Sequence, residues 1–248
     1  MDYGGVFIMQ HYFVDELNKY VFNFKKDDVH HIINVMRLKN NDEVVCIYDN
    51  KKYLCNLLIE NKMAYAKINK EIVDDSYLPI KVTIIYSMTK GEKFELVLQK
   101  ATELGVSEIV PLFTKKCIVS LDDKKIDSKM ERWNKILKEA SEQSRRSNIP
   151  VLHKPIKKNE IKEYMCDVNL IGDERKVIEG TKEMFSLVEN ASSISVLVGC
   201  EGGFTEDEFI YFNEIGFKGV SFGKRILRSE TAAIYALSCV AFVLESRK

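Results

Sequence analysis

The sequence lacks the features of an exported or membrane-spanning protein. Its most apolar run, Ala232–Leu244, is interrupted by Ser238 and is shorter than the about 20 residues that a bilayer crossing requires. Met1–Ile8 has neither the basic start nor the long apolar core of a signal peptide. We therefore expect a cytoplasmic protein without a membrane segment, and we interpret Ala232–Leu244 as a buried helix.

Closely spaced cysteines are also missing. The six cysteines are scattered, and no group of cysteines and histidines has the spacing of metal ligands. Without a secretion signal, disulfides are not expected either. We therefore expect no metal site, and six free thiols that are buried or half-buried.

Neither sign of charge is in excess. Lysine and arginine together number 37, as do aspartate and glutamate, so the formal net charge is zero. Indiscriminate binding to a polyanion needs a broad positive excess, which this composition excludes. A local basic face is compatible with it.

The first part of the chain has the pattern of a small β-rich unit. Apolar residues at helical spacing predict one helix over Asp27–Arg37. Three strands are predicted after it, over Glu43–Tyr48, Tyr53–Ile59 and Met63–Ile68, the first two joined by a polar turn at Asp49–Lys52. We interpret residues 1–73 as a small β-barrel domain with one helix.

The spacing of apolar residues changes at the polar segment Asp74–Pro79, and residues 74–248 are predicted to form a second domain. Short apolar runs here alternate with amphipathic helices, which is typical of a mostly parallel sheet covered on both faces. The predicted strands are Lys81–Ser87, Glu108–Phe113, Val168–Ile171, Ser195–Gly199 and Val220–Phe222, and the predicted helices include Glu92–Leu104 and Ser128–Arg145.

Glycines are few, at 12, so their clustering is informative. The strand that ends near Gly199 is followed by Gly202 and Gly203, and Thr205 with Glu208 fits a capping box that begins a helix. A glycine turn between strand and helix exposes backbone N–H groups to a ligand, and the ligand crevice of such sheets lies at this end of the strands. A tight turn without a ligand fits the pattern equally well.

A second turn of this kind begins at Gly223 and enters an alanine-rich helix that is apolar on most sides. Burying Arg228 and Glu230 beside that helix is costly unless they pair with each other or serve a ligand. The segment Ser87–Lys93 is a third candidate lining element. The fingerprints of dinucleotide-binding, P-loop, serine-hydrolase and metalloprotease sites are all absent.

These segments resemble one family. LVGCEGGFTEDE and SFGKRILRSETAAIYAL are similar to the paired motifs of the bacterial 16S ribosomal RNA uridine-N3 methyltransferases, the small subunit methyltransferase E family of the SPOUT class. SMTKGEKFELVLQKATELGVSEIVPL, ASEQSRRSNIP and HHIINVMR resemble further segments of the family in the same order. The resemblance begins near Met9, so we interpret Met1–Ile8 as an extension without function. Cys200 and Lys224 stand where the family usually has proline.

The resemblance implies a PUA-like RNA-binding domain followed by an α/β domain with a trefoil knot, S-adenosylmethionine as cofactor, and a homodimer that completes the site. The implied partner is 16S rRNA or the small ribosomal subunit. The implied cofactor-binding residues are Leu197, Gly199, Glu201, Gly202, Gly203, Phe222, Gly223, Ile226, Leu227, Thr231 and Ala232. Within this set, the glycines are assigned backbone contacts with the cofactor. Ile226 and Leu227 are assigned the apolar wall that holds the adenine.

The chemistry suggests further roles. Removing the N3 proton of uridine leaves negative charge on the flanking carbonyl oxygens, which a cation would stabilise, and Arg228 is our first hypothesis for that cation. Glu201 and Glu230 are candidates for accepting the proton or positioning the base. Cys200 is interpreted as a bystander, and Trp133 as a core or dimer contact. Arg145 and Arg146 are surrounded by polar serine and asparagine, so packing in a core does not explain their presence. The predicted RNA contacts are therefore His31, Arg37, Lys90, Lys93, Arg145 and Arg146.

Three alternatives remain at this point. Another member of the SPOUT class could methylate a different RNA position, but the N-terminal domain and the RILRSETAA motif favour the rRNA uridine. A non-catalytic ribosome-assembly protein predicts degraded cofactor loops, which are not seen. A methyltransferase for small molecules would have no use for a separate RNA-binding domain.

Overall fold

The computed structural model describes residues 9–118, 123–175 and 179–247. Met1–Ile8, interpreted above as an extension, therefore lies outside the described residues. The chain divides into two compact units: one contains the residues up to Tyr77 together with Ser141–Asn148, and the other contains Leu78–Ala140 and the residues from Ile149 onward. None of the helices in the described ranges is long and apolar enough to cross a bilayer.

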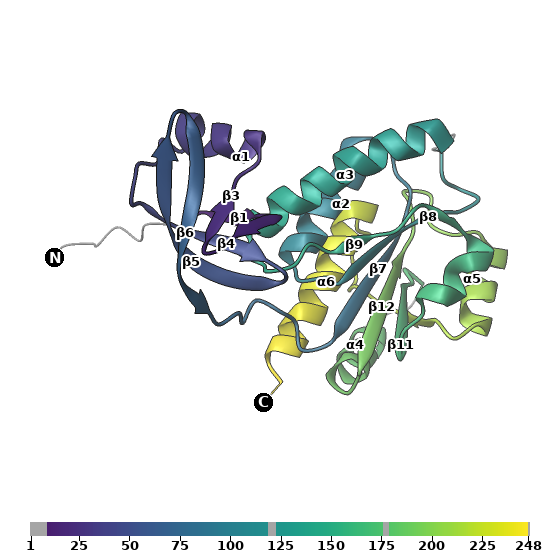
Figure 1. Ribbon diagram of the computed structural model, residues 1–248. Coiled ribbons are helices and arrows are strands. Elements are labelled where there is room, and N and C mark those ends of the chain that lie inside the picture. Colours follow the sequence, from purple (N-terminus) through teal and green to yellow (C-terminus); the bar gives the residue numbers. More distant parts are fainter. Residues whose placement is uncertain (1–8, 119–122, 176–178, 248) are drawn as a thin grey trace. The chain divides into compact units, whose positions relative to one another are not determined.

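The first unit is a six-stranded sheet with one helical segment (Figure 1). The strand order is β1-β4-β5-β6-β3-β2, all antiparallel except the β1–β4 pair. Among the described residues the edge strands β1 and β2 do not pair, so hydrogen bonds between them do not close the expected barrel. The strands are β1 (His11–Phe13), β2 (Glu16–Asn18), β3 (Val21–Asn23), β4 (Glu43–Tyr48), β5 (Lys51–Glu60) and β6 (Met63–Ile72).

Two tight turns set the register of the central strands. Asp49 and Asn50 both have positive φ, of 49° and 56°, and join β4 to β5. Asn61 and Lys62 do the same between β5 and β6. Positive φ at both central residues defines the turn whose twist matches that of the strands. The predicted turn is therefore confirmed, but it is two residues long and β5 begins earlier than expected, at Lys51.

The predicted helix over Asp27–Arg37 is only partly regular. The helix α1 (Lys26–His30) passes into the π-helical segment η1 (His31–Val35), where the Met36 N–H donates to the His31 carbonyl at 2.8 Å. The β-branched run Ile32-Ile33 and Val35 crowds a regular helix and favours this wider turn. At the start of this segment, Nδ1 of His31 lies 3.1 Å from the Tyr12 hydroxyl oxygen.

The segment Ser141–Asn148 belongs to the first unit although it begins in the last turn of a long helix, Asp123–Gln143, whose earlier residues belong to the second. Within that unit, the Phe13 N–H donates to the Glu142 carboxylate at 3.0 Å. The Ser147 hydroxyl bonds to Asp74, which also forms a buried ion pair with Lys52. The contacts of Glu142 and Ser147 join residues 129 and 73 positions apart, which local patterns do not predict.

The second unit is a parallel sheet of order β10-β8-β7-β12-β11-β13, with β9 paired to β8. Every pairing in it is parallel, which confirms the predicted sheet type. The strands are β7 (Lys81–Ser87), β8 (Glu108–Phe113), β9 (Val151–Leu152), β10 (Ile156–Lys157), β11 (Val168–Gly172), β12 (Ser193–Val198) and β13 (Lys218–Val220). Phe222, predicted to end a strand, lies in the loop after β13.

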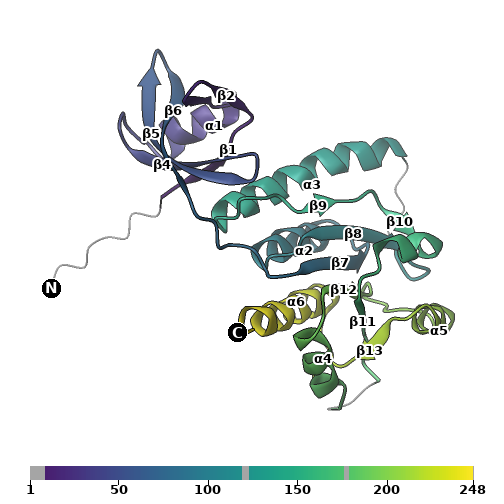
Figure 2. The same ribbon diagram turned by 60° about the horizontal axis from the view of Figure 1, so that its bottom comes forward.

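Helices cover both faces of this sheet, as the alternation predicted (Figure 2). Successive strand residues point to opposite faces, so Ile84 packs against one helical layer and Ile85 against the other. The first layer contains α2 (Glu92–Glu103), α3 (Asp123–Gln143), α4 (Glu179–Glu189) and α6 (Ser229–Glu245). The second contains η2 (Lys158–Tyr164) and α5 (Glu206–Glu214).

Several local predictions are confirmed in this unit. Trp133 is 2% exposed and packs on Phe94, with ring centroids 4.6 Å apart, so it is a core residue. The helix α2 stops before Gly105, which has a φ of 87°. All six cysteines are free and at least partly buried.

Candidate active site

Three loops meet at the carboxyl ends of neighbouring parallel strands of the second unit. They follow β12, β11 and β13, which lie side by side in the sheet. Together they line a cavity of about 690 Å³. The lining residues are Lys93, Lys116, Gly172–Arg175, Val198–Glu206, Phe209, Ser221–Ser229 and Ala232. The two glycine turns predicted from the sequence are therefore brought together at one site.

The turn after β12 is tightly built. Its Gly203 N–H donates to the Cys200 carbonyl at 2.8 Å, and the φ of Gly203 is 64°, which favours glycine. A Cβ at Gly199 would lie 3.1 Å from Gly203 Cα, so the close approach of the backbone favours glycine there too. Thr205 and Glu208 form the predicted capping box, which fixes the start of α5.

A segment that the sequence reasoning missed holds this turn from the side. The Lys116 ammonium donates to the carbonyls of Gly202 and Phe204 at 2.8 and 2.9 Å. The neighbouring Lys115 N–H donates to the Glu208 carboxylate at 2.7 Å. The only signal in the sequence is a pair of lysines just after a predicted strand, which does not reveal a contact 86 residues away.

The turn after β13 supplies the apolar surface. Gly223 has a φ of 99°, and its N–H donates to the Ser221 hydroxyl oxygen at 3.2 Å. Phe222 lies against Gly172, where a Cβ would be only 2.7 Å from the ring. Ile226 and Leu227 both line the cavity, and Ile226 is 77% exposed. An apolar side chain left so open offers surface to a ligand.

The sequence led us to expect that Arg228 and Glu230 are both buried, but only Glu230 is. Arg228 is exposed, lines the cavity and caps the start of α6 with extended backbone. Within the described parts of the chain its guanidinium forms no ion pair. Glu230 is 9% exposed, accepts from the Ser229 hydroxyl at 3.2 Å and does not line the cavity.

Glu201 and Lys93 form an ion pair at the cavity wall, with 2.7 Å between Nζ and Oε1. This hydrogen bond lowers the pKa of Glu201 and raises that of Lys93. Glu201 therefore stays ionised at neutral pH.

The loop after β11 forms a second charged wall that the sequence reasoning also missed. Arg175 pairs with Asp173 at 2.9 Å and with Glu206 at 3.0 Å, and its guanidinium lies 4.1 Å from the centre of the Phe209 ring. The polar residues directly after the strand Val168–Ile171 were the available signal.

Two residues of the implied cofactor set lie outside the cavity lining. Leu197 is fully buried in the core on the α5 face of the sheet. Thr231 is exposed in the first turn of α6. The remaining members of the set all line the cavity.

One premise about the predicted RNA contacts is wrong. Arg146 is 3% exposed, its guanidinium donates to Asn148 at 3.1 Å, and burial lowers its pKa to about 10. Arg146 is part of the packed interior of the first unit, so it is not available to bind phosphate. Arg37, Lys90 and Arg145 are exposed, and His31 is half-buried. Within the described residues, no group of carboxylate, thiol and imidazole side chains is arranged to hold a metal ion.

Comparisons with known proteins agree with this architecture. Residues 76–241 match the RNA methyltransferase domain family, and residues 24–68 match the RNA methyltransferase PUA domain. The class is thus an RNA methyltransferase with a PUA domain.

Named relatives narrow the class. Ribosomal RNA small subunit methyltransferase E of Bacillus subtilis is 34% identical over 96% of this chain and 98% of that protein. The protein of the same name from Mesomycoplasma hyopneumoniae is 33% identical over 93% of this chain and 98% of that protein.

Solved structures of similar proteins point to the same family. The crystal structure of ribosomal RNA small subunit methyltransferase E from Neisseria gonorrhoeae bound to S-adenosyl methionine is 30% identical, with a TM-score of 0.80 over 93% of this chain and 95% of that one. A putative methyltransferase from Legionella pneumophila with bound SAM is 27% identical, with a TM-score of 0.83 over 94% of this chain and 96% of that one. The chain belongs to the ribosomal RNA small subunit methyltransferase E family.

Proposed function

We propose that this protein transfers the methyl group of S-adenosylmethionine to N3 of one uridine in 16S rRNA of the small ribosomal subunit. The observation that carries the proposal is the cavity built by the two glycine turns, with the exposed Arg228 on its wall. Because ribosomes are assembled in the cytoplasm, the proposal includes that location.

The residues present fit this cofactor. The cavity volume of about 690 Å³ lies in the range of small-molecule sites. A Cβ at Gly203 or Gly223 would meet no atom within 4 Å, so both turns leave open space over their backbone. The open side chain of Ile226 suits an adenine ring, and the carboxylate of Glu201 suits a positively charged sulfonium.

When bound, S-adenosylmethionine supplies an activated methyl group on its sulfur. The task of the protein is then to hold the acceptor nitrogen in line and to stabilise its charge. Arg228 faces the cavity without an ion-pair partner in the described residues, so its guanidinium is available to donate to a uracil carbonyl oxygen.

Glu201 suits the role of proton acceptor better than Glu230, because only Glu201 lines the cavity. Its hydrogen bond to Lys93 lowers its pKa, which makes it a weak base whose proton must pass onward. Glu230 instead bonds to Ser229 beside Arg228, which suits a positioning role at the start of α6.

RNA binding in this proposal uses the PUA domain together with exposed cations. Arg37 and Arg145 in the first unit and Lys90 in the second are the residues assigned to phosphate contacts, with His31 and Lys93 as weaker candidates because each already has a partner. The trefoil knot and the homodimer enter the proposal through the family resemblance. Exposed Tyr235 and Phe242 on α6 support a dimer contact.

Two experiments test the proposal. Calorimetry on the purified protein should detect uptake of S-adenosylmethionine, and mass mapping of rRNA from a deletion strain should reveal one lost uridine methyl group in 16S rRNA. A folded protein that takes up no cofactor contradicts the proposal. A methyl group lost from another RNA position would instead favour a different specificity within the same class.

A further inference from the structure

The helix α6, whose start presents Arg228 to the cavity, does not begin with a capping side chain of the usual kind. Most helices begin after serine, threonine, aspartate or asparagine, whose side-chain oxygen accepts from the free backbone N–H groups of the first turn. The N-cap of α6 is Arg228, and a guanidinium has donors but no acceptor. In α5, by contrast, Thr205 and Glu208 form a capping box. The start of α6 therefore depends on a different contact.

A buried tyrosine of β7 provides that contact. The Tyr86 hydroxyl donates to Oγ of Ser229, the first residue of α6, at 3.0 Å. The Ser229 hydroxyl in turn donates to the Glu230 carboxylate at 3.2 Å. All three residues are buried, so water competes little for either bond. Burial raises the pKa of Tyr86 to about 12, so its phenol keeps the proton and donates at neutral pH.

The Tyr86 side chain is itself held firmly. Its strand lies between β8 and β12 in the sheet, where Tyr86 is opposite Pro111 and Val198. The centre of its ring lies 6.0 Å from that of Phe94, which packs on Trp133. A ring in such a close-packed interior has few other positions available. Tyr86 is therefore a fixed point in the core to which the start of α6 is bonded.

The anchored residue is next to the proposed catalytic cation. Ser229 and Arg228 both line the cavity, and the Arg228 carbonyl accepts from the Ala232 N–H at 2.8 Å in the first turn of α6. A shift of Ser229 therefore also moves the backbone from which the guanidinium extends. A displacement of about 1 Å at a catalytic group can cost a large factor in rate.

We propose that Tyr86 is a positioning residue: its hydrogen bond to Ser229 anchors the start of α6 and thereby aims Arg228 at the acceptor base. The role of Arg228 in this statement rests on the proposed function, whereas the anchoring of α6 does not. The two parts are therefore tested separately.

The kinetic test removes the phenol oxygen and keeps the ring. Y86F should lower kcat for methyl transfer to rRNA about tenfold, in keeping with the loss of one hydrogen bond, while the S-adenosylmethionine affinity and the KM for rRNA stay unchanged. S229A removes the acceptor of the same bond and leaves the packed ring in place, so it should also lower kcat. The matched control Y164F changes a tyrosine outside the cavity lining and should retain the wild-type kcat.

A double-mutant cycle separates positioning from a general loss of structure. Because Tyr86 acts through Arg228 in this proposal, Y86F has no cation left to misplace in an R228A background. In single-turnover assays, R228A/Y86F should therefore transfer methyl groups as fast as R228A. A further loss in the double variant, or wild-type kcat in both Y86F and S229A, would overturn the positioning role.

Amide hydrogen exchange tests the anchor without any methyl transfer. The Ala232 N–H becomes free to exchange when the first turn of α6 opens. Y86F should raise its exchange rate about tenfold, and Y164F should leave it unchanged. Unchanged exchange in both Y86F and S229A would refute the anchoring. A wild-type protein that transfers no methyl group contradicts the proposed function instead, and the exchange of Ala232 still decides whether Tyr86 anchors α6.

Discussion

Replacing Lys116 by methionine should weaken S-adenosylmethionine binding about tenfold while leaving the protein folded. The ammonium of Lys116 bridges the carbonyls of Gly202 and Phe204 at 2.8 and 2.9 Å, and its stem packs beside Gly202. Methionine keeps most of the stem and removes both hydrogen bonds. The glycine turn would then have to be ordered by the cofactor itself.

The magnitude follows from these two bonds. A hydrogen bond to a charged group contributes about 1.5–3 kcal/mol when it is protected from water. Lys116 is exposed, and solvent screening reduces such contributions strongly. A net loss of about 1.4 kcal/mol for the pair is therefore expected, which corresponds to a factor of about ten in the dissociation constant.

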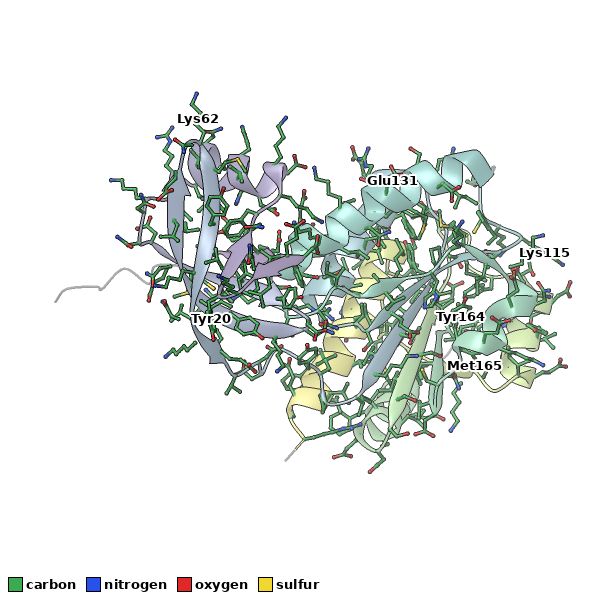
Figure 3. The ribbon with its side chains drawn as sticks, in the orientation of Figure 1. Tyr20, Lys62, Lys115, Glu131, Tyr164 and Met165 are labelled. Atoms are coloured by element: carbon green, nitrogen blue, oxygen red, sulfur yellow. The ribbon has the colours of Figure 1, made fainter. Side chains whose placement is uncertain are left out.

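The neighbouring residue supplies a matched control. The Lys115 side chain extends into solvent (Figure 3) and pairs with Asp207 at 3.3 Å, with both side chains mostly exposed. Such pairs contribute about 0–1 kcal/mol, so K115M should bind the cofactor like the wild type. Calorimetry measures the affinities, and thermal unfolding checks the fold. Unchanged affinity in K116M, or an equal loss in both variants, would refute the reasoning.

Three further outcomes are expected. R228A should lower methyl transfer to rRNA about 100-fold or more with little change in cofactor affinity, and wild-type turnover in a radiolabel assay would contradict its assigned role. G172A should displace the Phe222 ring, which a Cβ would approach to 2.7 Å, and calorimetry should detect weaker cofactor binding. For Asp74, burial opposes ionisation, but hydrogen bonds from Lys52, Ser147 and Ser76 prevail and lower its pKa to about 2. Because the pKa in the unfolded chain is about 3.9, this stabilisation is present above pH 4 and is lost as the pH falls toward 2. D74N should therefore unfold at lower urea concentration than the wild type at pH 7, by a margin that shrinks below pH 4, and a constant margin would contradict this account.

Local features of the chain were predictable from sequence because their causes are local. The capping box at Thr205 and Glu208 involves residues three positions apart, and it is present as predicted. The strand Lys81–Ser87 was predicted with its bounds, because its apolar run fits a strand buried on both faces. The approach of the two glycine turns also followed from the rule that parallel strands end at one edge.

Other predictions failed because distant residues decided them. Polar neighbours suggested that Arg146 is free, yet it is buried within a unit whose other residues lie more than 60 positions earlier in the chain. The expectation that Arg228 and Glu230 are both buried beside α6 treated them alike, whereas only Glu230 is buried. The short strands β1, β2 and β3 were missed, since segments of three residues carry too little periodicity to detect.

The sequence by itself determined the type and order of the main helices and strands, the two glycine turns, and the family, since each depends on residues close together or on a motif read in order. Only the tertiary structure decided which side chains hold and face the cavity. Lys116 and Arg175 reach it from separate loops, and nothing in their immediate neighbours specifies that contact. Packing of the whole sheet brings these loops to one edge, and that packing is a property of the folded chain rather than of any one segment.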